Sequence, residues 1–257
     1  MARVFITGSS DGLGLMAGKL LVQWGHRVTL HARNEARATD ARRALPQADA
    51  VVVGDVASIT ATRSVADQVN ALGAHDAVIH NVGVGSRGGR IETTDGLSQL
   101  FAVNVLAPYL LTALLTRPDR LVYVSSGMHN SGDAHLDDAQ WVKRRWNGSQ
   151  AYSDSKLFDV MLAFAVARLW PMVKSNAITP GWVPTKMGGA GAPDSLALGA
   201  VTQCWLAVSD EASALVSGHY FYHKKIERTH HAATRKELQD QLLDYCAKLT
   251  GVALPRT

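Results

Sequence analysis

The sequence predicts a single doubly wound α/β domain, in which a parallel sheet of about seven strands carries helices on both faces. Two observations predict this class. Short runs that are apolar at successive positions alternate with longer stretches of helical periodicity, and neither a linker nor an internal repeat divides the 257 residues. Continuous apolar runs are typical of strands covered on both faces, and strand–helix–strand units place parallel strands side by side.

Seven segments have the composition of strands, since they are short and rich in Val and Ile. They are residues 3–7, 27–33, 50–56, 76–82, 121–125, 175–178 and 218–223. Between them, apolar residues recur at three-to-four spacing, which predicts amphipathic helices. These helices are residues 13–24, 59–72, 96–115, 152–169, 195–208 and 234–249. Ser58 is placed to cap the second helix, and Pro171 follows the fourth, as expected past a helix end.

Composition excludes several classes of protein. Hydrophobic residues make up 47% and charged residues 19% of the chain, so a core can form without disulfides or a metal. The net charge of +4 is spread along the chain, which argues against a nucleic-acid partner. No apolar run approaches the roughly 20 residues that span a bilayer, and the chain enters a strand at once. We expect a cytoplasmic protein without a membrane span, with Cys204 and Cys246 as reduced thiols.

A glycine-rich loop, TGSSDGLG at residues 7–14, joins the first strand to the first helix. Gly8 permits a sharp turn, Gly12 lets the backbone approach a pyrophosphate, and Gly14 lets the helix pack against the strand. Helix N-termini favour anions, so the loop predicts a dinucleotide site; the alternative is a glycine-rich turn without a ligand. The candidate contacts are Gly8, Ser9, Ser10, Gly12, Leu13 and Gly14.

The end of the second strand bears on the choice of cofactor. NAD sites usually place an acidic residue there, whereas this chain has Arg33 followed by Asn34. The planar guanidinium of Arg33 can pair with a 2′-phosphate, which favours NADP(H). A surface arginine is the alternative, and the negative charge of Asp11 argues mildly against NADP(H). Further cofactor contacts, with ordinary turn residues as the alternative, are expected at Asp55, Val56, Asn81, Val82 and Gly83.

Tyr152 and Lys156 open the long helix after the fifth strand. Their spacing puts both side chains on one helical face, where the ammonium stabilises a phenolate. Such a tyrosine can donate a proton in a reduction and remove one in an oxidation. An isolated Tyr-x-x-x-Lys more often has no joint role. Here the serine pair Ser125-Ser126 and the glycine-rich loop favour a joint role for Tyr152 and Lys156.

Taken in order, these motifs resemble the short-chain dehydrogenases/reductases. The matching residues are Thr7-Gly8-x-x-x-Gly12-x-Gly14, Asn81-x-Gly83, Asn104, Ser126, Tyr152-x-x-x-Lys156 and Pro180-Gly181-x-Val183-x-Thr185. The resemblance implies a Rossmann fold and an oxidoreductase. It implies Tyr152 as acid/base, Lys156 as the residue that holds the nicotinamide ribose, Ser126 as the group that orients the carbonyl oxygen, and Asn104 as the anchor of a relay water. Nicotinamide-side contacts would come from Pro180, Gly181, Val183 and Thr185.

Two departures from the family pattern concern Val82 and the insert at 127–150. Val82 is bulkier than the alanine that the family often has there. Tyr152 follows Ser126 by 26 positions, about twice the gap of many members. The insert, together with the segment 183–187, is similar to the branch of retinol-dehydrogenase-like and protochlorophyllide-reductase-like proteins. Members of that branch often handle bulky apolar substrates. We expect elements of the substrate region at about 127–150 and 182–230.

Several aromatic residues invite further hypotheses. His129 could touch substrate, and Trp141, Trp146 and Trp182 could line an apolar pocket, although aromatic residues at such places belong to the core at least as often. No grouping of His, Cys or Asp has familiar zinc spacing, so no metal is expected.

The sequence thus predicts an NADP(H)-dependent enzyme that interconverts a carbonyl and an alcohol on a small, apolar substrate. Two other functions stay open: an NADP(H)-binding sensor or interaction protein with little turnover, and a reductase of carbon–carbon double bonds. A homodimer through the long helices is also open, because their apolar residues can face either a second copy or the sheet.

Overall fold

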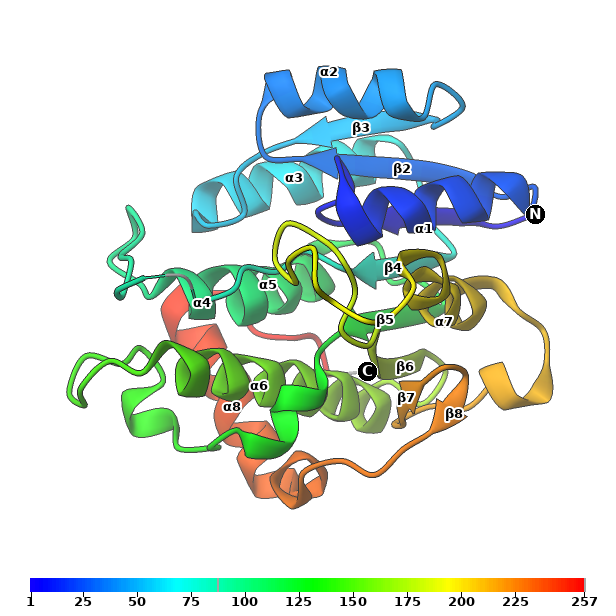
Figure 1. Cartoon of the computed structure of the whole chain (residues 1–257). Helices are drawn as coiled ribbons and strands as arrows, with labels where there is room; N and C mark the ends of the chain where they lie inside the picture. The colour runs from blue at the N-terminus through cyan, green and yellow to red at the C-terminus, as the bar shows by residue number, and fades with distance from the viewer. Residues whose placement is uncertain (87, 257) are drawn as a thin grey trace.

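The computed structural model of the chain describes residues 1–86 and 88–256 and has one eight-stranded sheet at its centre (Figure 1). The strands lie in the order β3-β2-β1-β4-β5-β6-β7-β8. Their bounds are β1 Arg3–Ile6, β2 Arg27–Ala32, β3 Ala50–Val53, β4 Ala77–His80, β5 Arg120–Val124, β6 Lys174–Thr179, β7 Tyr220–Tyr222 and β8 Lys225–Ile226. Strands β1 to β7 pair in parallel, which confirms the predicted class.

The eighth strand has no counterpart in the prediction of seven, and it runs antiparallel to β7. A tight turn at His223 and Lys224, with φ angles of +46° and +63°, reverses the chain between β7 and β8. Turns of this kind usually carry glycine or asparagine, and neither residue stands there. With two exposed residues, β8 is also too short to show a hydrophobic pattern.

Helices cover both faces of the sheet. α1 (Gly12–Gln23), α2 (Glu35–Ala44) and α7 (Leu196–Val208) cover one face, and α3 (Ile59–Ala71), α5 (Ala107–Leu114) and α6 (Gly148–Leu169) cover the other. α8 (Lys236–Thr250) packs against α5 and α6 (Figure 1), so the chain's own C-terminal helix covers part of the long helices. The short helical segments are α4 Gln99–Phe101, η1 Ala102–Leu106, η2 Gly127–Ser131, η3 Leu136–Asp138, η4 Ala212–Ala214 and η5 His231–Thr234.

Three helices differ from the prediction. The stretch 96–115 begins only at Gln99 and contains a π-helical turn, η1, between α4 and α5. α6 begins at Gly148 rather than Tyr152, because the Asn147 side chain accepts a hydrogen bond from the Gln150 N–H at 3.1 Å. α2 was not expected, since its buried stripe consists of alanines and gives little hydrophobic periodicity. Among residues 1–86 and 88–256, no helix combines the length and the apolar character that crossing a membrane requires.

Two large apolar clusters form most of the core, and strand β1 contributes to both. Phe5 packs into one cluster, while Val4 and Ile6 pack into the other. This alternation shows that both faces of the strand are covered, which explains why its sequence is apolar at every position. The free thiols of Cys204 and Cys246 are buried in different clusters.

The winding of the chain changes direction at β1. From β1 the chain moves outward to β2 and β3, and it then returns to place β4 on the other side of β1. Ligands of open α/β sheets bind at such a switch point, outside the carboxyl ends of the strands. The loops that follow β1 and β4 meet there.

Candidate active site

The loop after β1 turns at Gly8 and again at Gly12, whose φ angles are +60° and +53°. Residues with side chains rarely adopt this conformation. Gly14 is required for a different reason, because a Cβ there would lie 2.5 Å from the Asn81 Nδ2 and from the Gly8 oxygen. A Cβ on Gly12 would lie 3.8 Å from Thr185, an ordinary van der Waals contact, so its positive φ rather than crowding requires glycine there.

Hydrogen bonds to two strands hold the loop in place. The Ser9 hydroxyl accepts a hydrogen bond from the His31 N–H at 2.8 Å, and the His31 ring accepts one from the Gly8 N–H at 2.9 Å. The Asn81 side chain, after β4, donates to the carbonyls of Thr7 and Gly8 at 3.0 Å each. Ser9 is completely buried, so its side chain serves the loop. His31 belongs to no motif in the sequence.

The N-terminus of α1 lacks the side-chain cap that four other helices have. Those caps come from Asn34, Ser58, Asn147 and Ser195, and Ser58 is thereby confirmed as the N-cap of α3. Asp11 stands at the N-cap of α1 but makes no capping bond. Its carboxylate pairs instead with Arg37 at 2.5 Å and with Lys186 at 2.7 Å. The first N–H groups of α1 are thus available to an anion.

Two arginines, rather than the predicted one, lie near the carboxyl end of β2. Arg33 directly follows the strand and is exposed. Asn34 uses its side chain to cap α2, accepting a hydrogen bond from the Arg37 N–H at 3.0 Å. Arg37 is half-buried and reaches from α2 to Asp11 in the glycine-rich loop. The contact with Asp11 connects Arg37 to the glycine-rich loop, and no local sequence pattern predicts it.

Asp55 and Val56, which follow Gly54 after β3, have different surroundings. Asp55 is exposed, and its carboxylate accepts a hydrogen bond from the Ala57 N–H at 3.0 Å, which is the geometry of a turn aspartate. Val56 is 4% exposed and packs into the core. A ligand at this point could therefore meet Asp55 but not the Val56 side chain.

Val82 and Gly83 carry the chain from β4 across the end of the sheet. The Val82 backbone lies so close to the loop that a Cβ on Gly8 would be 2.8 Å from the Val82 Cα. A Cβ on Gly83 would lie 3.5 Å from the Lys156 Nζ and 3.6 Å from the Asn104 Oδ1. Gly83 therefore links the glycine-rich loop to the predicted catalytic residues.

α6 brings Tyr152 and Lys156 together, as their spacing predicts. The half-buried Tyr152 donates a hydrogen bond from its hydroxyl to the Met187 sulfur at 3.8 Å. Lys156 is 3% exposed, and its Nζ lies 5.9 Å from the centroid of the Tyr152 ring. This ammonium donates to the Val124 carbonyl at 2.9 Å and to the Asp159 carboxylate at 2.7 Å. Groups of α6 and β5 thus hold the cation near the phenol.

Asn104 lies completely buried in the π-helical turn η1. Its Oδ1 accepts a hydrogen bond from the Val84 N–H at 2.8 Å, and its amide group donates to the Val84 carbonyl at 3.1 Å and to the Ser155 hydroxyl at 3.0 Å. These bonds tie the segment after β4 to α6. π-helical turns are frequent at functional sites.

The two serines after β5 have different roles in the structure. Ser125 is buried, and its hydroxyl donates to the Lys156 carbonyl at 2.7 Å. Ser126 is half-buried, and its hydroxyl oxygen accepts a hydrogen bond from the Met128 N–H at 3.2 Å. The Ser126 hydroxyl can still donate its own hydrogen to another acceptor.

His129 follows Ser126 by three residues, but it is closed off from any substrate. Its ring is 0% exposed, stacks near Tyr220 and contacts the Ser126 carbonyl at 2.7 Å and the Thr229 hydroxyl at 3.0 Å. The hypothesis that His129 touches substrate is therefore wrong, because packing between η2 and the segment after β8 buries the ring.

The segment after β6 covers both the glycine-rich loop and Tyr152. Pro180 and Gly181 turn the chain, with Gly181 at a φ of +85°. The Val183 side chain is 6% exposed and packs inward, whereas Thr185 is half-buried and faces Gly12. Met187, which the sequence does not single out, rests its sulfur against the Tyr152 hydroxyl.

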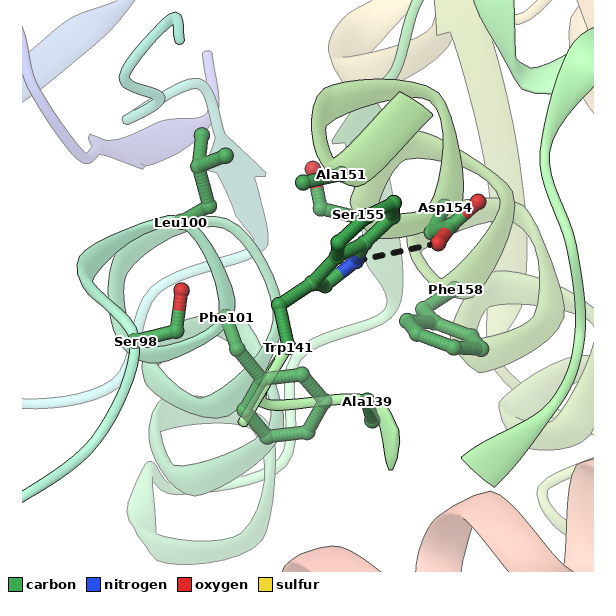
Figure 2. A pocket seen from close by; sticks show the side chains of 9 residues that line it. All are labelled: Ser98, Leu100, Phe101, Ala139, Trp141, Ala151, Asp154, Ser155 and Phe158. Carbon is green, nitrogen blue, oxygen red and sulfur yellow. Dashed lines mark hydrogen bonds between the residues drawn. The ribbon is translucent and has the colours of Figure 1, made fainter. Parts of the chain in front are cut away.

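Asp154 anchors the insert at 127–150 to α6. Its buried carboxylate accepts hydrogen bonds from the Asp133 N–H at 2.8 Å, the Trp141 indole N–H at 3.2 Å, the Arg144 guanidinium at 3.0 Å and the Gln150 amide at 2.8 Å. Figure 2 shows the Trp141 N–H directed at this carboxylate. One side chain inside the Tyr152–Lys156 motif thus accepts four hydrogen bonds from the insert.

The three tryptophans proposed as pocket residues are placed differently. Trp141 is 6% exposed and forms part of the packing in Figure 2, so it is a core residue. Trp146, like Tyr152, packs against a third, small apolar cluster of Leu100, Trp141 and Ala151. Trp182 is 60% exposed, and its indole donates to the Gly188 carbonyl at 2.9 Å.

Comparison with known proteins identifies a family that covers most of the chain. The family model described as short chain dehydrogenase matches residues 2–195. An uncharacterized oxidoreductase of Emericella nidulans, AN7799, is 43% identical, with 99% of each chain covered. Human retinol dehydrogenase 13 is 30% identical over 98% of this chain and 85% of its own length. Relatives therefore include the retinol-dehydrogenase-like branch.

The comparison of structures agrees on the fold. A blue fluorescent protein from a metagenomic library, solved in complex with NADPH, superposes with a TM-score of 0.69 at 20% identity, covering 86% of this chain and 95% of that one. At this identity the likeness concerns the arrangement of helices and strands.

Proposed function

The chain belongs to the short-chain dehydrogenase family, and we propose that it is an NADP(H)-dependent oxidoreductase that interconverts a carbonyl and an alcohol on a small, apolar substrate. The observation that carries the proposal is the position of the Lys156 ammonium, 5.9 Å from the centroid of the Tyr152 ring and next to Gly83. A proton donor and a cation thus share the edge of the sheet where the glycine-rich loop lies.

The residues of this edge fit a dinucleotide. The uncapped N-terminus of α1 offers N–H groups to phosphates, and Gly12, which has no side chain, lets the backbone approach them. When bound, the nicotinamide would supply or accept the hydride. We assign the binding to Gly8, Ser9, Ser10, Gly12, Leu13, Gly14, Arg33, Asn34, Asp55, Val56, Asn81, Val82, Gly83, Tyr152, Lys156, Pro180, Gly181, Val183 and Thr185. Buried side chains such as Ser9 and Val56 would contribute through their backbone.

The preference for NADP(H) rests on Arg33 and on the two cations that pair with Asp11. The exposed Arg33 guanidinium can pair with a 2′-phosphate. Arg37 and Lys186 offset the negative charge of Asp11, which otherwise opposes a phosphate. We therefore assign a direct contact to Arg33 and a supporting one to Arg37.

Proton transfer is assigned to Tyr152. In a reduction its hydroxyl would give a proton to the carbonyl oxygen, and in the reverse direction it would take one. The Lys156 ammonium stabilises the phenolate that remains. Ser126 would donate a hydrogen bond to the same oxygen. Asn104 would bind a relay water through its backbone or side-chain oxygen, because both hydrogens of its side-chain amide already bond Val84 and Ser155.

An apolar substrate is supported by exposed apolar side chains on η2 and on the segment after β6, of which Met187 touches Tyr152. Three large apolar residues are exposed on the segments that flank it: Met128 at 41%, Trp182 at 60% and Met187 at 43%. Exposed apolar groups on neighbouring segments are typical of a binding surface for apolar ligands. We also propose a cytoplasmic location, since buried free thiols at Cys204 and Cys246 suit a reducing compartment.

The test compares the protein with its Tyr152→Phe variant on a panel of aldehydes, ketones and quinones, following NADPH absorbance. We expect turnover to fall by about 10²- to 10⁴-fold while NADPH binding is retained. Tyr245→Phe, on α8, is the matched control. Undiminished turnover in Tyr152→Phe would contradict the assignment. Tight NADPH binding without turnover across the panel would favour a sensor, and product analysis would reveal a carbon–carbon double-bond reductase.

A further inference from the structure

α6 carries a third ionisable side chain close to Lys156. Asp159 stands one helical turn later, and both side chains are 4% exposed. The Lys156 Nζ lies 2.7 Å from the Asp159 Oδ2 and 2.9 Å from the Val124 carbonyl oxygen. The ammonium is therefore held between α6 and β5 by one charged and one neutral acceptor.

Burial distinguishes this ion pair from the others around the site. The pair of Lys186 and Asp11 has side chains that are 83% and 46% exposed, so water screens it. A buried ammonium without a counter-ion is strongly disfavoured, because the apolar surroundings cannot replace its hydration. Asp159 is thus needed for Lys156 to be a cation at this depth.

Neighbouring groups act on the pair from two elements. Burial alone would lower the pKa of Lys156, but the Asp159 carboxylate, assisted by Tyr152 on the same helix, outweighs burial and raises it. Burial raises the pKa of Asp159 to about 6, against the attraction of Lys156. On β5, burial raises the pKa of Tyr123, and Asp159 adds to that rise.

We propose that Asp159 is a positioning residue of the active site, whose buried carboxylate is the counter-ion that holds the Lys156 ammonium beside Tyr152. The proposal rests on the function assigned above to Lys156 and Tyr152. An ammonium has three N–H donors, and Asp159 and Val124 engage two of them. The third can serve a ligand hydroxyl, so Asp159 acts through the direction and the charge of Lys156.

Asp159→Asn separates charge from shape, because asparagine keeps the size and one oxygen acceptor of aspartate. Lys156 loses its counter-ion in this variant, and burial then favours the neutral amine. We expect the pKa of Lys156 to fall by about three units, which brings its deprotonation into the range between pH 7 and pH 9. The measurement is a pH titration of the ¹³Cε signal of Lys156 in the cofactor-free protein, assigned by its loss in Lys156→Arg. A Lys156 pKa that stays the same in Asp159→Asn overturns the proposal.

The unaltered protein provides a second titration that does not depend on the folding of a variant. The Lys156 ¹³Cε signal should shift as the pH passes through about 6, where Asp159 takes up a proton. If the Asp159 ¹³Cγ signal titrates and the Lys156 ¹³Cε signal does not shift over the same pH range, the 2.7 Å contact between the two groups is contradicted in solution.

Dinucleotide binding distinguishes a positioning role from a structural one. From pH 7 to pH 9, we expect the affinity of Asp159→Asn for NADPH or NADH, whichever binds more tightly, to fall by about tenfold, while that of the unaltered protein changes little. Asp154→Asn, a buried aspartate of the same helix that anchors the insert, is the control and should keep the original pH dependence. If the dinucleotide affinity depends equally on pH in both variants and Asp159→Asn has lower thermal stability, Asp159 only forms a structural ion pair. Should neither dinucleotide bind, the proposed function fails, and the NMR titration still tests Asp159.

Discussion

The imidazole Nδ1 of His31 accepts a hydrogen bond from the backbone N–H of Gly8 at 2.9 Å. Because Nδ1 is the acceptor, the ring hydrogen lies on Nε2, which donates to the Gly54 carbonyl at 2.8 Å. The ring is 1% exposed, and burial lowers the pKa of His31. A neutral histidine thus joins the first glycine of the glycine-rich loop to β2 and to the end of β3.

Acid should weaken this arrangement. The folded protein holds the pKa of His31 below the 6.5 of an unfolded histidine, so the unfolded chain takes up this proton first as the pH falls. The contribution of His31 is therefore complete above about pH 6.5 and decreases below it, by about 1.4 kcal/mol per pH unit until the folded pKa is reached. His31→Gln can keep both hydrogen bonds without titrating, and its melting temperature should depend less steeply on pH.

The measurement is the melting temperature between pH 5 and pH 8, together with dinucleotide affinity over the same range. Burial lowers the pKa of His80 to about 3, so some acid dependence should remain in His31→Gln. The exposed His231, replaced by glutamine, is the control. If His31→Gln and His231→Gln show the same acid dependence as the unaltered protein, His31 does not act as described.

Arg33 and Arg37 should affect cofactor binding differently. Arg33→Ala removes the predicted 2′-phosphate partner, so NADPH affinity should fall by about 10- to 100-fold while NADH affinity stays within about twofold. Arg37→Ala leaves Asp11 with Lys186 alone, and the negative charge that remains should weaken both dinucleotides. Arg42→Ala, on the exposed side of α2, should change neither affinity. Calorimetric titration of both dinucleotides measures these effects, and an equal loss of NADPH and NADH in Arg33→Ala would refute the 2′-phosphate contact.

Asp154→Ala should loosen the insert at 127–150. The variant leaves the Trp141 indole N–H and the partly exposed Arg144 guanidinium without their shared acceptor, at an expected cost of about 2–3 kcal/mol in the free energy of unfolding. Trypsin should then cut the basic run at 143–145 sooner than in the unaltered protein. Asp137→Ala, an exposed aspartate of the same insert, is the control. Unchanged cleavage in Asp154→Ala would show that the insert is held by other contacts.

Local spacing was sufficient to predict the glycine-rich loop and the reactive pair. Gly8, Gly12 and Gly14 belong to a single turn, and their backbone requirements are set within a few residues. Tyr152 and Lys156 share a helical face because four residues make about one turn. The same reasoning predicted seven of the eight strands, since a strand buried on both faces must be apolar along its length.

Contacts between distant segments decided what local patterns do not contain. His31 lies 23 residues from Gly8, and Arg37 lies 26 residues from Asp11. Neither His31 nor Arg37 belongs to a sequence motif. Each contributes to the site through a partner that lies near it only in the folded sheet. Packing likewise buried His129, which sequence reasoning had placed against a substrate.

The sequence by itself determined the class of fold, the glycine-rich loop, and the shared face of Tyr152 and Lys156. The tertiary structure alone decided which side chains are buried away from water, which are charged and which form pairs, as Lys156 does with Asp159. The physical reason is that helix and strand geometry sets the direction of a side chain over a few residues. Its hydration and its counter-ion depend on surfaces that other parts of the chain supply.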